Sequence, residues 1–76
     1  MRFKAYILIN LVATDLAQTI NGIRKVDGVR FADAITGPYD AIAQIEADNI
    51  NEIGRIVTSG LLKVPGVAKT LTCVAV

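Results

Sequence analysis

The segment Gly37-Pro38-Tyr39-Asp40 holds the residue types in this chain that are most able to do chemistry. It places an aromatic hydroxyl and a carboxylate beside a glycine-proline turn, immediately before a stretch that alternates like a strand. Free backbone amides in such a turn could hold a small carboxylate. Glycine, proline and aspartate also make turns for purely structural reasons, so the segment alone favours the structural interpretation.

Thr70 and Thr72 are a second candidate, because residues two apart in a strand share one face. Both hydroxyls could reach the amino or carboxylate group of one ligand. Threonine is also a favoured strand residue, so this pair alone again favours the structural interpretation. Cys73 is expected on the opposite face, towards the helices, where it would behave as a small hydrophobe.

Enzymatic and metal chemistry find little support in the composition. The sequence has no histidine and a single cysteine, so the usual zinc, haem and di-iron ligand sets are absent. Its seven acidic residues are spread along the chain, and no nucleophile has a partner base. We therefore expect a protein without metal or cofactor that is not an enzyme.

Four strands and two helices must position the candidate residues. Alternation and β-branched residues predict strands at Phe3–Val12, Val29–Thr36, Asp40–Ala47 and Val67–Val76. Apolar residues at helical spacing predict two helices, one capped by Thr14 or Asp15 and ending near Val26, the other capped by Asp48 or Asn49 and ended by Pro65-Gly66. Right-handed crossovers in this β-α-β-β-α-β order place both helices on one side of an antiparallel sheet.

The two halves of the chain share a short repeat. Lys25-Val26-Asp27-Gly28-Val29 recurs as Lys63-Val64-Pro65-Gly66-Val67, 38 positions later. The halves look like copies of one unit. The alternative is that any helix-to-strand turn favours glycine followed by valine, and five residues do not decide between the two.

The size of the chain and its uncovered sheet face predict self-association. A domain this small buries only about 60% of the surface that its unfolded chain exposes, and one cysteine allows no internal disulfide. The face away from the helices is too apolar to face water comfortably. On it we place Tyr6, Leu8, Val12, Ile42, Val74 and Val76. We expect this face to meet another sheet, unless a one-residue slip exchanges the faces of a strand.

Charge and hydropathy exclude other classes of partner. The net charge is +1, and the longest run of like charge is Arg24-Lys25, which does not suit a nucleic-acid binder. The longest apolar stretch, Ala5 to Ile9, is far below the roughly 20 residues needed to cross a bilayer. The start of the chain lacks a signal peptide's apolar core. We expect a cytoplasmic protein without membrane contact.

The motifs together resemble the C-terminal effector-binding (RAM) domain of the Lrp/AsnC transcription regulators. The resemblance rests on Gly37-Pro38-Tyr39-Asp40 before the third strand and on Leu62-Lys63-Val64-Pro65-Gly66-Val67 ahead of Thr70 and Thr72, and it covers essentially all of the chain. It implies an α+β, ferredoxin-like sandwich, dimers formed through the sheets, and commonly a ring of eight subunits.

The resemblance also implies an amino-acid effector bound between dimers. The residues that match the family's site are Gly37, Pro38, Tyr39, Asp40, Thr70 and Thr72. Turn amides and hydroxyls could hold the α-carboxylate while Asp40 takes the α-ammonium. Asp40 could instead hold the turn together.

Full regulators of this family carry an N-terminal helix-turn-helix domain, whereas this sequence starts directly with its first strand. We therefore expect one domain over residues 1–76 that does not bind DNA directly and that senses amino acids, co-assembles with full-length Lrp/AsnC relatives or modulates another protein. Two alternatives stay open. One is an assembly module without a functional ligand site, and the other is a small ferredoxin-like enzyme with a cavity between paired sheets.

Overall fold

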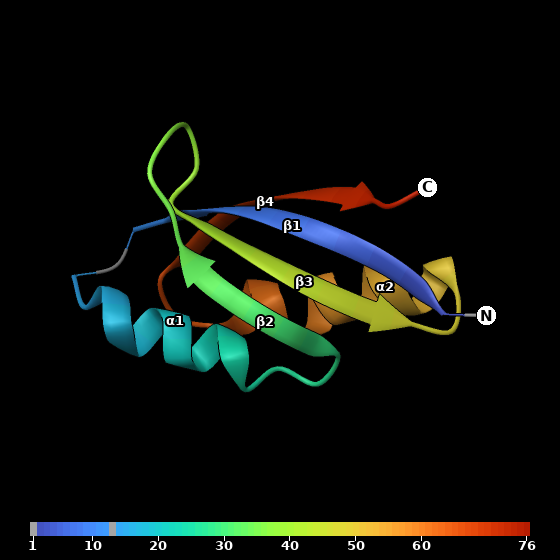
Figure 1. Cartoon of the computed structure of the whole chain (residues 1–76). Helices are drawn as coiled ribbons and strands as arrows, with labels where there is room; N and C mark the ends of the chain where they lie inside the picture. Colours follow the sequence, from blue (N-terminus) through green and yellow to red (C-terminus); the bar gives the residue numbers. More distant parts are fainter. Residues whose placement is uncertain (1, 13) are drawn as a thin grey trace.

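The computed structural model describes residues 2–12 and 14–76 and has the predicted order of elements (Figure 1). Its strands are β1 (Phe3–Leu11), β2 (Val29–Ala34), β3 (Ala41–Ala47) and β4 (Val67–Val74), and its helices are α1 (Leu16–Arg24), α2 (Ile50–Ser59) and the 3-10 helix η1 (Leu61–Lys63). Neighbouring strands pair antiparallel in the order β2-β3-β1-β4, and the helices cover one side of the sheet. The expected α+β, ferredoxin-like sandwich is confirmed.

Each main helix begins at a side chain that caps its free amides. Asp15 caps α1, because its carboxylate accepts a hydrogen bond of 3.1 Å from the amide of Gln18. Asn49 caps α2 in the same way, through a bond of 2.8 Å from the amide of Glu52. Such a bond satisfies one of the donors that a helix start leaves unpaired. Of the two capping residues predicted for each helix, the structure uses the second.

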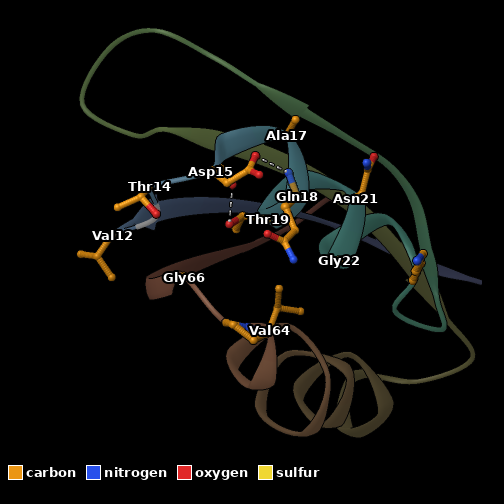
Figure 2. A pocket seen from close by; sticks show the side chains of 12 residues that line it. Val12, Thr14, Asp15, Ala17, Gln18, Thr19, Asn21, Gly22, Val64 and Gly66 are labelled. Atoms are coloured by element: carbon orange, nitrogen blue, oxygen red, sulfur yellow. Dashed lines mark hydrogen bonds between the residues drawn. The ribbon is translucent and has the colours of Figure 1, made fainter.

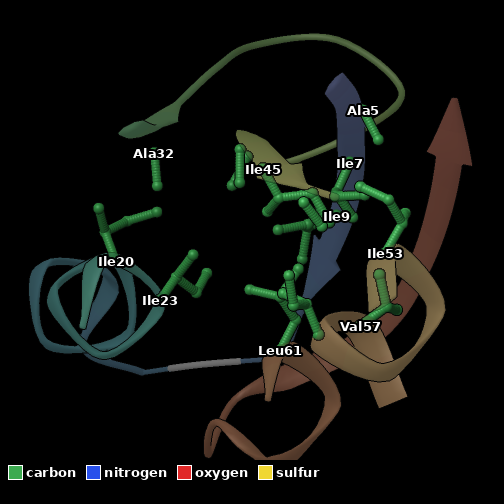
Figure 3. Packing of buried hydrophobic residues seen from close by; sticks show 14 residues of the cluster. Ala5, Ile7, Ile9, Ile20, Ile23, Ala32, Ile45, Ile53, Val57 and Leu61 are labelled. Atoms are coloured by element: carbon green, nitrogen blue, oxygen red, sulfur yellow. The ribbon is translucent and has the colours of Figure 1, made fainter. Parts of the chain in front are cut away.

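The core lies between the sheet and the helices (Figure 3). Alternate residues of β1 and β3 point towards the helices, and on β3 these are mostly alanines, as the alternation predicted. Their small side chains let the helices pack close to the sheet. The buried apolar residues are Ala5, Ile7, Ile9, Ile20, Ile23, Ala32, Ala41, Ala43, Ile45, Ala47, Ile53, Ile56, Val57 and Leu61.

The opposite side of the sheet, here called the open face, is covered by no element of the described chain (Figure 1). Residues paired across antiparallel strands lie on the same face. In the central rows, Leu8 lies opposite Ile42 and Leu71, and Tyr6 lies opposite Gln44 and Cys73. The prediction for Tyr6, Leu8 and Ile42 is therefore confirmed. Phe31 of β2 lies opposite Gln44 of β3 and extends the same surface.

The faces of β4 are the reverse of those predicted. Val74 lies opposite Ala5, and therefore on the helix face, because a bulge interrupts the pairing of β4 with β1. Asn10 pairs with Lys69 and Leu11 pairs with Val67, which leaves Ala68 as an extra residue. One extra residue exchanges the two faces of the strand beyond it. Val12 and Val76, also expected on the open face, lie beyond the ends of the strands.

The repeated segment has the same backbone geometry in both halves. Gly28 and Gly66 each adopt a φ of 97°, a conformation that glycine tolerates and other residues rarely adopt. Two residues after each glycine the strand carries a bulge, at Arg30 in β2 and at Ala68 in β4. The repeat therefore extends beyond five letters of sequence to the turn and the first part of the strand.

The two halves also exchange matching contacts where their helices end. A Cβ atom placed on Gly22 of α1 would lie 3.0 Å from Cγ1 of Val64, and one on Gly60 would lie 2.6 Å from Cγ1 of Val26. Gly22 and Gly60 are separated by the repeat distance, and so are Val26 and Val64. Each half thus places its valine against the glycine of the other half.

Candidate functional site

The Gly37 turn joins β2 to β3 and rises from the sheet on the side away from the helices (Figure 1). Gly37 has a φ of 128°, and nothing lies within 4 Å of a Cβ placed on it, so glycine is needed here for its conformation alone. The turn is tied to β1, because the side-chain amide of Asn10 donates a hydrogen bond of 3.1 Å to the carbonyl of Pro38. Tyr39 is half-buried in this turn.

Asp40 holds the turn to the end of β1 through two hydrogen bonds and closes the turn through a third. Its carboxylate oxygen Oδ2 accepts a bond of 2.8 Å from the amide of Leu11. Its own amide donates to the carbonyl of Ile9 at 2.9 Å, and its carbonyl accepts from the amide of Ile35 at 3.0 Å. The structural role considered for Asp40 is thus present, with one carboxylate oxygen left over for a ligand.

The predicted threonines lie on the other face of the sheet from the Gly37 turn. Thr70 is opposite Ile9 and Thr72 is opposite Ile7, and both isoleucines point into the core beneath the helices. Thr70 is half-buried and Thr72 is exposed, because β4 is an edge strand that the helices cover only in part. Within one chain, therefore, the structure does not bring the turn and the threonine side chains to one site.

Cys73 is placed on the open face, not towards the helices as predicted. It lies opposite Tyr6 and is exposed to solvent. The bulge at Ala68 that reverses the faces of Thr70 and Thr72 moves Cys73 as well. Its neighbour on the open face is an aromatic ring, so it does not serve as a core hydrophobe.

A cleft of about 830 Å³ opens between α1 and the turn before β4 (Figure 2). The described residues lining it are Val12, Thr14, Asp15, Ala17, Gln18, Thr19, Asn21, Gly22, Lys25, Val64, Pro65 and Gly66. No sequence pattern predicted this cleft, because its walls come from distant segments that form no motif. Two of its polar groups serve the start of α1: Asp15 caps the helix, and the Thr19 hydroxyl donates a hydrogen bond of 3.1 Å to the Asp15 carbonyl.

Within residues 2–12 and 14–76, the shifted pKa values belong to one pair on α2. A side-chain hydrogen bond from Arg55 lowers the pKa of the Glu52 carboxyl; desolvation opposes this effect, and the positive charge of Arg55 adds to the lowering. The same hydrogen bond raises the pKa of Arg55. Both groups lie on α2, on the helix side of the sheet, with Arg55 exposed and Glu52 half-buried, so they mark no acid-base centre at the Gly37 turn.

Residues 2–12 and 14–76 contain neither a metal-binding cluster nor a membrane-spanning helix. No group of three or more acidic, cysteine or histidine side chains in this part of the chain could hold a metal ion. No helix in the same residues is long and apolar enough to span a bilayer. Neither result adds a further site to the turn, the open face and the cleft.

Comparison with known proteins decides the family. The model of the Lrp/AsnC ligand binding domain matches residues 4–76. The chain belongs to this family. An uncharacterized HTH-type transcriptional regulator of Pyrococcus abyssi is 36% identical over 58 residues, which are 76% of this chain and 39% of that protein. The chain thus spans well under half the length of this curated relative.

Solved structures of similar proteins share the fold. A protein from Thermus thermophilus is 28% identical and superposes with a TM-score of 0.88, over 97% of this chain and 92% of that one. A transcriptional regulator from Neisseria meningitidis, crystallised as a complex with L-Met, gives a TM-score of 0.86 at 21% identity, over 97% of this chain and 49% of that one. The Lrp/AsnC family and the ferredoxin-like fold predicted from the sequence are therefore confirmed.

Proposed function

We propose that this chain is an amino-acid-binding regulatory module that self-assembles and modulates full-length Lrp/AsnC-type transcription regulators. The match of residues 4–76 to the ligand-binding domain of that family carries the proposal. The L-Met complex of the Neisseria regulator supports an amino acid as the ligand. The regulators among the relatives support a regulatory role in place of an enzymatic one.

Self-assembly is supported by the composition of the open face. Phe31 and Leu71 are 40% and 46% exposed there, and Leu8 and Ile42 lie between them. Charged and polar residues occupy the two ends of this face, where Lys4 pairs with Glu46 and Asn10 pairs with Lys69. An apolar centre with a polar rim is the usual anatomy of a protein interface. Two copies meeting through this face would form a dimer, and dimers would assemble further, up to the octamer that the family resemblance implies.

Assembly would also give the predicted site residues a common location. The Gly37 turn and the side chains of Thr70 and Thr72 face opposite sides of one sheet. The turn of one copy can therefore meet the threonines only of another copy. We infer that a ligand held by the complete set Gly37, Pro38, Tyr39, Asp40, Thr70 and Thr72 would bind between subunits.

Calorimetry tests the proposal. The assembled protein is titrated with each of the twenty amino acids at millimolar concentration, after its mass in solution has been measured by light scattering. We expect saturable binding of at least one amino acid by an oligomer. A monomer under these conditions, or an oligomer that binds none of the twenty, would contradict the proposal.

An assembly module without a ligand site is the second candidate. It is favoured by the hydrogen bonds of Asp40, because they explain the Gly37 turn as a structural element without any ligand. Affinity capture of the tagged chain from its source cells separates the two. Recovery of a full-length Lrp/AsnC regulator, with no change on adding amino acids, favours the assembly module.

A further inference from the structure

Three polar residues from separate segments lie in a row at the end of the open face next to the Gly37 turn. Asn10 on β1 lies directly opposite Lys69 on β4. On the other side of β1, the carboxylate of Asp40 reaches the amide of Leu11, one residue beyond Asn10. Adjacent strands are about 4.8 Å apart, so a carboxylate, an amide and an ammonium group leave the backbone within a short row.

Each of the three side chains retains bonding capacity for a ligand. Asp40 uses Oδ2 for the amide of Leu11, which leaves Oδ1 as an acceptor. Asn10 uses its amide nitrogen for the carbonyl of Pro38, which leaves its oxygen as an acceptor. Lys69 is exposed and forms no ion pair within residues 2–12 and 14–76. The row therefore offers acceptors at one end and a cation at the other.

We propose that Lys69 binds the α-carboxylate of a zwitterionic amino acid whose α-ammonium is bound by Asp40 and Asn10. This inference rests on the proposed function and assigns the α-carboxylate to a different group, because the family resemblance implied turn amides and threonine hydroxyls for it. The bulge at Ala68 turns Lys69 towards the side of the Gly37 turn and turns Thr70 away from it. A ligand with both charges satisfies the whole row, whereas a simple amine or a simple acid leaves one protein charge unpaired.

The position of the row is compatible with assembly through the same face. The rows around Leu8 and Tyr6 lie nearer the middle of the sheet, and Asn10 and Lys69 lie at its end. A second copy can cover the centre while this end stays at the rim, where polar groups of interfaces remain accessible.

The experiment uses pairs of ligands that differ only in the carboxylate. The first pair is L-methionine and its decarboxylated amine, 3-(methylthio)propylamine. The other amino acids follow, each paired with its own decarboxylated amine. We expect the wild-type chain to bind the amino acid roughly tenfold or more tightly than the amine. Lys69→Met should abolish this preference, and Lys69→Arg should keep it.

Two further variants complete the test. Lys63→Met removes an exposed lysine from η1 on the helix side and should leave the preference intact. Retention of the preference by Lys69→Met, or its loss in Thr70→Val with Thr72→Val, would overturn the role of Lys69 while leaving the proposed function standing. Failure of the wild-type oligomer to bind any of the twenty amino acids would overturn both. Thermal melting and light scattering of every variant separate these results from misfolding or loss of assembly.

Discussion

The carboxylate of Asp40 accepts a 2.8 Å hydrogen bond from the backbone amide of Leu11, at the point where β1 leaves its partner strand β3. The side chain thereby takes the place that a further residue of β3 would occupy as an acceptor. Asp40 is thus both the anchor of the Gly37 turn and one end of the proposed binding row.

Asp40→Ala should destabilise the domain by about 1–2 kcal/mol, because it removes a charged acceptor and leaves the amide of Leu11 without a partner. Asp40→Asn keeps an acceptor oxygen and should cost less. Urea unfolding measures both. Asp33→Ala is the matched control, since it removes only an exposed pair with Arg24 and should change stability by less than about 0.5 kcal/mol. Equal effects of Asp40→Ala and Asp33→Ala would refute the anchoring role.

Substitution by alanine should change the stability of the domain in opposite directions at two glycines of the second half, Gly54 and Gly60. Gly54 lies inside α2 with nothing within 4 Å of an added Cβ, so Gly54→Ala should stabilise the domain by up to about 1 kcal/mol. A Cβ on Gly60 would lie 2.5 Å from the carbonyl oxygen of Ile56 and 2.6 Å from Val26 Cγ1, so Gly60→Ala should cost about 1–3 kcal/mol. Thermal or urea unfolding provides the comparison. An unchanged free energy of unfolding in Gly60→Ala would show that the contact between the halves is loose.

Leu71→Lys places a charge in the central row of the open face, beside Leu8, and should break the assembly without unfolding the chain. Leu71 is 46% exposed in the single chain, so lysine there meets solvent unless another copy covers it. Leu62→Lys is the matched control, because Leu62 is 41% exposed but lies on η1 in the helix layer. Light scattering and circular dichroism should show a smaller particle with native secondary structure for Leu71→Lys only. An unchanged mass for this variant would rule out the open face as the interface.

The ion pair on α2 gives a prediction about pH. Arg55 lowers the pKa of Glu52 from its usual 4.5, mainly through a side-chain hydrogen bond. A carboxyl whose pKa is lower in the folded state stabilises that state above its unfolded pKa, and this contribution disappears as the pH falls through the folded pKa. In an NMR titration, Arg55→Gln should return the pKa of Glu52 towards 4.5. Arg24→Gln, which affects the pair with Asp33 and the hydrogen bond to the carbonyl of Ala32, should leave the titration of Glu52 unchanged.

Much of the architecture could be predicted because its causes are local. Asp15 and Asn49 cap helices through amides three residues away, and Gly28 permits a turn through its own φ. The core face of β1 follows from strict alternation of Ala5, Ile7 and Ile9 with larger or polar residues. The resemblance in the Gly37 turn and in the segment before β4 was enough to identify the family.

The faces of β4 and the composition of the candidate site were decided by the tertiary structure. Counting two residues at a time back from Val76 puts Thr70 and Thr72 on the open face with Val74, and the bulge at Ala68 reverses that result. A bulge depends on how two distant strands, here at Leu11 and Val67, come into register, and no local propensity of β4 records that pairing. The sequence by itself therefore determined which segments form the domain. Long-range pairing determined that Lys69, and not the threonines, lies beside Asn10 on the side of the Gly37 turn.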